Sequence, residues 1–157
     1  MKKKKIRGIW FFGMSGVGKT YISQNLHKKI KDSVLVDGDD VRKNISTDLG
    51  YTKKDRVKQI KRVFGICKII LKSKKFPIAS TVYFNKDLNN KCKKNGIVPI
   101  KVERNNFSKI IKHHKTYKNN SNIVGLDINY QNFKTLKIIN ENNKIFIKKL
   151  KLLKFTK

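Results

Sequence analysis

The chain has 157 residues, of which 38% are hydrophobic, and its formal net charge is +29, which suits one basic domain with one buried core. No apolar run is long enough to cross a bilayer, and two cysteines without a paired ligand spacing argue against a disulfide framework or a zinc site. These features predict a cytoplasmic protein that does not contact a membrane.

Strands and helices are expected to alternate along the chain. A basic end at residues 1–5 precedes an apolar run that continues into a glycine-rich loop, which favours a buried strand over a signal peptide. The expected strands are residues 6–12, 33–37, 77–84, 96–103 and 135–140. The expected helices are residues 20–30, 55–73 and 106–114 (capped by Asn106 or Ser108). Residues 144–155 fit a strand or a helix, and we favour a helix. This alternation predicts one α/β domain over residues 1–157, with three layers and a mostly parallel sheet.

The segment GMSGVGKT, residues 13–20, matches the phosphate-loop pattern G-x-x-x-x-G-K-[ST] between a strand and a helix. Its glycines allow several backbone N–H groups to face one anion, and the helix dipole adds attraction. Lys19 would reach the terminal phosphates and Thr20 would hold Mg²⁺. An ordinary glycine turn is the alternative, but the flanking strand and helix favour ATP and Mg²⁺. The loop residues expected to bind ATP are Gly13, Ser15, Gly16, Val17, Gly18, Lys19 and Thr20.

Carboxylates follow the second predicted strand, which ends in VDGDDVR, residues 36–42. Ligands of parallel sheets bind beyond the carboxyl ends of the strands, so Asp37 and Asp39 should lie near the phosphate loop and residues 81–84. A carboxylate there can orient Mg²⁺ or accept a proton from an attacking hydroxyl. The alternative is a turn whose aspartate caps a helix. Beside a phosphate loop we favour a catalytic and metal-binding role for Asp37.

A third segment, DLGYTKKDRVKQIKR at residues 48–62, completes a set of motifs in one order with close spacing. Together the three motifs resemble the adenylyl-sulfate kinase family, which phosphorylates the 3′-hydroxyl of adenosine 5′-phosphosulfate. The family forms are G-x-S-G-x-G-K-[ST], D-G-D-N-x-R and D-L-G-F-S-x-x-D-R-x-x-N-x-R-R. The resemblance extends from about Ile9 to Phe84 and more weakly to about residue 130. It implies a phosphate-loop kinase fold.

The resemblance also implies roles for individual residues. Asp37 would lie near Mg²⁺ and the accepting hydroxyl. Tyr51 replaces the family phenylalanine near the substrate base, and Arg56 matches the arginine that binds the phosphosulfate. Gln59 replaces an asparagine, and Arg62 matches the second arginine of N-x-R-R. The residues implied in substrate binding are Asp39, Arg42, Tyr51, Arg56, Gln59, Val82, Tyr83, Lys115 and Gly125.

The chain also departs from the family pattern. Asp40 replaces an asparagine, which adds negative charge beside an anionic substrate. The region expected to form the lid, residues 113–128, looks shortened, and so does the carboxy-terminal region. His113 and His114 replace the arginine and aspartate of the family lid motif, and Lys115 is the best match for its lysine. A shortened lid would exclude water from the site less well.

The basic composition has two explanations. The 34 lysines, 5 arginines and 16 asparagines, together with abundant isoleucine, are typical of an AT-rich coding sequence. A surface that binds nucleic acid is the other explanation. We favour compositional drift, because the lysines are spread over the whole chain. Three of the five arginines, Arg42, Arg56 and Arg62, fall in matched motifs, which suggests that guanidinium geometry is needed there.

The sequence therefore predicts transfer of the ATP γ-phosphoryl group to the 3′-hydroxyl of adenylyl sulfate, with Lys19 and Asp37 as the catalytic residues. The expected partner is a small anionic nucleotide rather than nucleic acid, and a homodimer is left open. One alternative is a phosphate-loop kinase for another small-molecule hydroxyl. Another is a nucleotide-binding basic protein that binds nucleic acid without kinase turnover.

Overall fold

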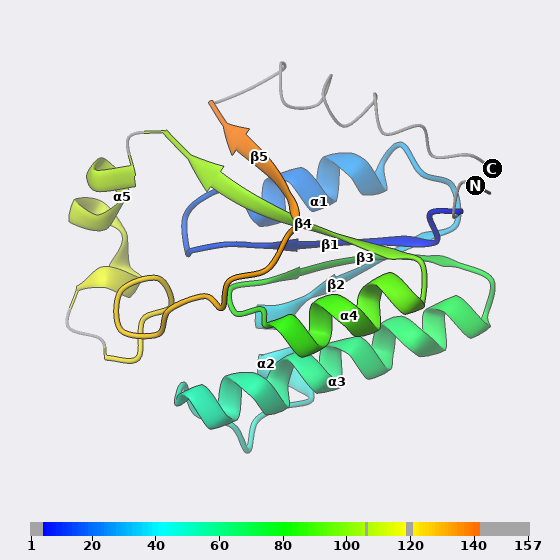
Figure 1. Cartoon of the computed structure of the whole chain (residues 1–157), viewed down its shortest axis with the longest axis horizontal. Helices are drawn as coiled ribbons and strands as arrows, with labels where there is room; N and C mark the ends of the chain where they lie inside the picture. The colour runs from blue at the N-terminus through cyan, green and yellow to red at the C-terminus, as the bar shows by residue number, and fades with distance from the viewer. Residues whose placement is uncertain (1–4, 106, 119–120, 142–157) are drawn as a thin grey trace.

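The computed structural model describes residues 5–105, 107–118 and 121–141 (Figure 1). Its elements run in the order β1 (Gly8–Phe12), α1 (Lys19–His27), β2 (Ser33–Asp37), α2 (Gly38–Asn44), α3 (Lys53–Lys72), β3 (Phe76–Thr81), α4 (Lys86–Lys94), β4 (Ile97–Arg104), α5 (Phe107–His113), the 3-10 helix η1 (Lys115–Tyr117) and β5 (Leu136–Asn140). The helix predicted at 144–155 and the cap predicted at Asn106 lie outside the described residues.

The five strands form one sheet in the order β2-β3-β1-β4-β5, and every neighbouring pair is parallel. The sheet is thus parallel throughout the described residues, and not only mostly parallel as expected. Strand β1 lies at its centre, and all five of its residues are buried. A central parallel strand is covered on both faces, which explains why its sequence, GIWFF, is a continuous apolar run.

Helices cover both faces of the sheet, which confirms the three-layer α/β architecture (Figure 1). Strand β1 alternates its side chains between two cores. Ile9 and Phe11 belong to the core that also contains Ile22 and Leu26 of α1. On the other face, Trp10 and Phe12 of β1 belong to the core built against α3 and α4. Other large buried members of this core include Ile60, Val63, Phe84 and Leu88.

Two helices were not expected from the sequence. Helix α2 begins directly after β2, and the Asp37 side chain caps it by accepting a hydrogen bond from the Asp39 N–H. Helix α4 is capped by Asn85, whose side chain accepts from the Leu88 N–H at 2.8 Å. Both helices were missed because they are short and mostly polar, so little apolar periodicity marks them.

The remaining boundaries shift by a few residues. Helix α1 ends at His27 and not at residue 30, and β3 covers Phe76–Thr81 in place of 77–84. Helix α3 begins at Lys53, two residues earlier than predicted, because Thr52 caps it by accepting from the Asp55 N–H. Ser108 was one of two predicted caps for α5, but it lies inside that helix.

None of the helices in the part of the chain that the structure describes is long and apolar enough to cross a membrane. Cys67 and Cys92 are unpaired and buried. Burial raises the pKa of the Cys67 thiol to about 12 and also raises the pKa of Cys92. Neither thiol is therefore suited to act as a nucleophile.

Phe84 joins the sheet to the loops at its carboxyl edge. Its ring stacks on Phe12, with centroids 4.3 Å apart, and packs edge-on against Trp10 at 5.7 Å. Phe133, in the segment that leads to β5, contacts both Phe12 and Phe84 at about the same separation. This aromatic cluster lies under the loops that follow β1 and β3.

We predict that Phe84→Ala lowers the free energy of unfolding by about 3–5 kcal/mol, because Phe84 is fully buried and its loss leaves a cavity. Urea denaturation followed by circular dichroism measures the effect. The matched control is Ile69→Ala, since Ile69 is 66% exposed and its loss should cost less than about 1 kcal/mol. Equal losses for the two variants would contradict the assignment of Phe84 to the core.

Candidate active site

Loops from three parallel strands meet at the carboxyl edge of the sheet. Strand β1 leads into the phosphate loop, β2 ends at Asp37, and β3 ends at Ser80 and Thr81. Two cavities of about 340 and 490 Å³ lie there, and we call them the phosphate cavity and the acceptor cavity. Both cavities are lined by Ser15, Gly38, Asp39, Thr81, Val82 and Thr116, so the two cavities adjoin.

Five of the predicted loop residues line the phosphate cavity, namely Ser15, Gly16, Gly18, Lys19 and Thr20, whereas Gly13 and Val17 do not. Gly18 has φ +94°, in the left-handed region that favours glycine, and a Cβ there would strike the Asn140 side chain. Asn140, at the end of β5, donates from Nδ2 to the Val17 carbonyl at 2.9 Å. The Val17 side chain is itself buried in the core on the α1 face. Gly13 also requires its lack of a side chain, because a Cβ would meet the Val102 carbonyl.

Lys19 is turned back onto its own loop. Its Nζ donates to the Met14 carbonyl at 2.8 Å, and the side chain is buried. Burial lowers the pKa of Lys19 to about 8, while the nearby carboxylates of Asp39 and Asp37 oppose this shift. In this position the ammonium group is held by the backbone of its own loop.

Asp37 connects the three converging loops. Its Oδ2 accepts from the Thr20 hydroxyl at 3.1 Å and from the Ser80 hydroxyl at 2.8 Å, and its Oδ1 accepts from the Asp39 N–H at 2.9 Å. The helix cap offered as the alternative is confirmed, because Asp37 caps α2. Asp37 also faces Thr20, and its catalytic and metal-binding role stays a prediction. A hydroxyl and a carboxylate oxygen side by side are ligands that Mg²⁺ prefers, so Thr20 and Asp37 fit a magnesium site.

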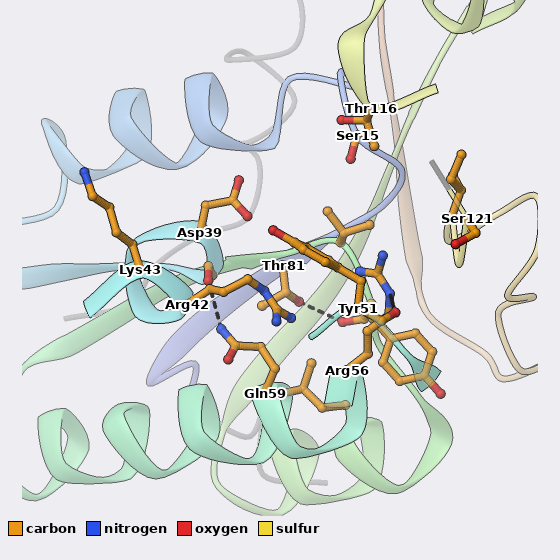
Figure 2. A pocket seen from close by; sticks show the side chains of 15 residues that line it. Ser15, Asp39, Arg42, Lys43, Tyr51, Arg56, Gln59, Thr81, Thr116 and Ser121 are labelled. Carbon is orange, nitrogen blue, oxygen red and sulfur yellow. Dashed lines mark hydrogen bonds between the residues drawn. The ribbon is translucent and has the colours of Figure 1, made fainter. Parts of the chain in front are cut away.

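The acceptor cavity is dominated by two guanidinium groups around one aromatic ring (Figure 2). The guanidinium carbons of Arg42 and Arg56 lie 4.7 and 5.5 Å from the centroid of the Tyr51 ring. Backbone carbonyls hold both groups: Arg42 donates to Leu49 and Gly50, and Arg56 donates to Tyr51 and Asn122. Neither arginine forms an ion pair with any carboxylate of the described residues.

The electrostatics of this cavity favour an anion. Burial lowers the pKa of Arg56, and the positive charge of Arg42 lowers it further. Two like charges kept close without a carboxylate partner are stabilised when an anionic ligand binds between them. Asp39 lines the same cavity, and desolvation together with the charge of Asp37 raises the pKa of its carboxyl group.

Some of the other predicted substrate-binding residues line a cavity and others do not. Gln59, Val82 and Tyr83 line the acceptor cavity, and Gln59 Nε2 donates to the Gly38 carbonyl at 2.9 Å. Lys115 is exposed on η1 and lines neither described cavity. Gly125 also lies outside them, with φ +93°, and a Cβ there would strike the Met14 side chain. Gly125 thus packs against the Met14 side chain of the phosphate loop.

Several residues of the site were not among the site residues expected from the sequence. The Tyr117 hydroxyl donates to the Ser15 carbonyl at 2.9 Å, and His114 packs beside Gly16 in the phosphate cavity. The Tyr130 hydroxyl donates to the Val82 carbonyl at 2.7 Å. These contacts attach residues 114, 117 and 130 to the loops that follow β1 and β3. Their only sequence signal is a tyrosine or histidine in a polar loop, which is equally typical of surface packing.

The family model of adenylylsulphate kinase matches residues 5–116 of the chain. The chain belongs to this family. The adenylyl-sulfate kinase of Clostridium kluyveri is 36% identical over 90 residues, which are 55% of this chain and 45% of that protein. The enzyme of the same name from Bacteroides thetaiotaomicron is 37% identical over 84 residues, 51% of this chain and 42% of that one. This family member therefore spans about half the length of the curated relatives that it matches.

The fold is also found among solved structures. The Mycobacterium tuberculosis APS kinase CysC, solved in complex with AMPPNP and APS, superposes with a TM-score of 0.71, and the match covers 98% of both chains at 20% identity. A gluconokinase from Sinorhizobium meliloti superposes with a TM-score of 0.50 over 71% of this chain at 18% identity. At these identities the superpositions establish the phosphate-loop kinase fold of this family member.

We predict that Gly18→Ala in this family member weakens ATP binding at least tenfold, because a side chain there is strained and displaces Asn140 from the loop. Isothermal titration calorimetry with ATP measures the effect. Gly65→Ala is the matched control, since a Cβ at Gly65 of α3 would have nothing within 4 Å. That variant should keep its ATP affinity and gain about 0.5–1 kcal/mol of stability. Unchanged ATP binding in Gly18→Ala would contradict the assigned role of the loop.

Proposed function

We propose that this protein transfers the γ-phosphoryl group of ATP to the 3′-hydroxyl of adenylyl sulfate, which gives 3′-phosphoadenylyl sulfate and ADP. The observation that carries the proposal is the pair Arg42 and Arg56, held around Tyr51 without a described carboxylate partner and directly beside the phosphate cavity. A nucleotide with a phosphosulfate group supplies both an anion for the guanidinium groups and a flat base for the tyrosine ring. Membership of the adenylylsulphate kinase family supports the same choice.

The phosphate cavity would bind ATP. Lys19 would move from the Met14 carbonyl to the terminal phosphates, and the N–H groups of the loop would hold the other phosphate oxygens. Thr20 and Asp37 would hold Mg²⁺, which neutralises charge on the phosphates when bound. Ser80 and the α2 backbone fix the Asp37 carboxylate, so its geometry is set before any ligand arrives.

The acceptor cavity would position the hydroxyl for attack. Arg42 and Arg56 would bind the phosphosulfate and Tyr51 would contact the base. Asp39 lines both cavities, so the acceptor and the γ-phosphate would meet beside it, and Asp37 would orient the hydroxyl or the metal. Phosphoryl transfer requires little covalent chemistry from the protein, so catalysis would come from positioning and electrostatic stabilisation.

We predict that the purified protein with Mg-ATP and adenylyl sulfate forms the 3′-phosphorylated product, detected by anion-exchange chromatography. Lys19→Ala should abolish product formation, because it removes the cation that contacts the transferred group. Arg56→Ala should raise KM for adenylyl sulfate about 10- to 100-fold, the value of one or two charged hydrogen bonds. Arg7→Ala is the matched control, since Arg7 is exposed beside the amino end of β1, at the opposite edge of the sheet.

Product formation that survives Lys19→Ala would contradict this mechanism. Absence of product, with ATP turnover stimulated by a sugar or another hydroxyl compound, would favour a different acceptor. Tight binding of DNA or RNA that weakens steeply with salt and survives Lys19→Ala would favour the nucleic-acid alternative.

The metal site has its own prediction. Thr20→Ala should raise the Mg²⁺ concentration needed for half-maximal activity, because the variant loses one proposed ligand and a donor to Asp37. Thr20→Ser keeps the hydroxyl and should restore most of the metal affinity. The measurement is a magnesium titration at fixed ATP. An identical magnesium requirement in wild type and Thr20→Ala would argue against the assigned ligand.

The homodimer that the sequence left open is still an open question. One structurally similar protein, from Thiobacillus denitrificans, is described as a hexameric APS kinase and superposes with a TM-score of 0.51 at 23% identity. Light scattering of the purified protein determines which assembly this chain forms.

A further inference from the structure

Helix α3 presents three polar side chains at a spacing of three residues, which places them along one side of the helix. Arg56 donates to the Asn122 carbonyl in the lid region, and Gln59 donates to the Gly38 carbonyl at the start of α2. Arg62, the third, pairs with Asp48. The first two line the acceptor cavity, whereas Arg62 does not line either described cavity.

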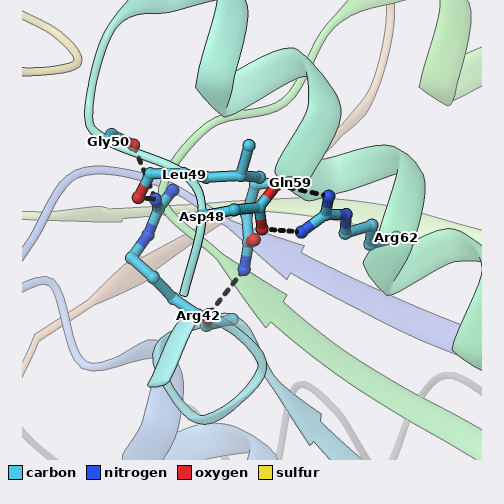
Figure 3. Close-up of polar contacts among 7 residues, drawn as sticks. Arg42, Asp48, Leu49, Gly50, Gln59 and Arg62 are labelled. Atoms are coloured by element: carbon cyan, nitrogen blue, oxygen red, sulfur yellow. Dashed lines mark hydrogen bonds and ion pairs between the residues drawn. The ribbon is translucent and has the colours of Figure 1, made fainter. Parts of the chain in front are cut away.

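The contact of Arg62 with Asp48 uses both terminal nitrogens of the guanidinium group (Figure 3). Nη1 donates to Asp48 Oδ1, and Nη2 donates to Oδ2 at 2.8 Å. The hydrogen bond from Arg62 holds the pKa of Asp48 down, at about 2. A two-point contact between planar groups fixes orientation as well as distance. Asp48 is thereby held in one position relative to α3.

The two residues after Asp48 hold Arg42, the arginine proposed to bind the acceptor. Arg42 Nη1 donates to the Leu49 carbonyl at 3.2 Å and to the Gly50 carbonyl at 2.6 Å. Figure 3 shows Asp48 turned towards Arg62 and the following carbonyls turned towards Arg42, on opposite sides of the same short loop. Arg42 therefore depends on the orientation of two peptide groups whose chain position is fixed at Asp48.

We infer that the Asp48–Arg62 pair is a positioning device for Arg42, and that it sets the affinity for the anionic acceptor without touching it. The inference rests on the proposed function, because it assigns Arg42 to acceptor binding. Arg62 fixes Asp48, Asp48 orients the carbonyl groups of residues 49 and 50, and these aim the remaining N–H donors of Arg42 at the cavity. This explains why a guanidinium is used at position 62, where lysine could not make the two-point contact.

If the pair served only to stabilise the fold, its loss would lower the unfolding temperature and leave the acceptor KM unchanged. Asp48 is exposed and Arg62 is partly exposed, with 57% and 36% of their side chains accessible to solvent. Exposed ion pairs contribute little to stability. Loss of the pair should therefore leave the unfolding temperature nearly unchanged, while the acceptor KM rises.

The kinetic test uses Asp48→Asn and Arg62→Lys in the whole chain. We expect KM for adenylyl sulfate to rise about tenfold, with KM for ATP and the unfolding temperature close to wild type. The matched control is Asp87→Asn, which removes an exposed ion pair with Lys91 on α4 and should change none of these quantities. In an Arg42→Ala background, Asp48→Asn should add no further loss, because the residue that it positions is gone.

A second readout does not depend on the substrate. The chain has only five arginines, so the Nε–H signals in a ¹⁵N correlation spectrum can be assigned individually. Asp48→Asn should shift or broaden the Arg42 signal, and Asp87→Asn should not. An unchanged Arg42 signal, or equal rises in both KM values with a lower unfolding temperature, would overturn the inference. A wild-type protein that gives no product from adenylyl sulfate would overturn the proposed function, and the Arg42 signal would still decide the positioning role.

Discussion

The hydrogen bonds of the Asp37 carboxylate hold the candidate site together. One oxygen receives the hydroxyls of Thr20 and Ser80, and the other receives the N–H of Asp39. These donors come from α1, from β3 and from the first turn of α2, so a single side chain fixes three loops relative to one another. The arrangement is available only where parallel strands end side by side, which makes the sheet order a condition of the site.

The acceptor side relies on a different constraint: its two guanidinium groups form no ion pair with a carboxylate of the described residues, although Asp39 lines the same cavity. Arg42 and Arg56 satisfy part of their donors with backbone carbonyls, which orient them without neutralising them. In a chain with 39 basic and 10 acidic residues, such local positive charge is common. What distinguishes this pair is its fixed geometry around Tyr51, and a lysine-rich surface does not supply such geometry.

The strands and the phosphate loop could be predicted because their signals are local. The apolar run of β2 predicted residues 33–37, as observed, and the glycine pattern predicted the loop between β1 and α1. Helix α2 was offered only as a turn with a cap, since a seven-residue helix with one buried apolar side chain leaves no periodic pattern. The roles assigned to Lys115 and Gly125 by resemblance stay predictions, and the structure places both residues outside the two cavities. Their surroundings depend on contacts between distant segments, such as Gly125 against Met14, that no local pattern encodes.

The hydrogen bond of Lys19 links the phosphate loop to the segment around Gly125. The Met14 carbonyl that holds its ammonium group belongs to the residue whose side chain packs against Gly125 in the lid region. If a bound phosphate draws the ammonium group away, the Met14 carbonyl loses this donor, and the contacts of the residue that packs against Gly125 would change. Any such coupling is reciprocal by thermodynamic linkage: the factor by which nucleotide binding would favour a rearrangement around Gly125 is the factor by which that rearrangement would favour nucleotide binding.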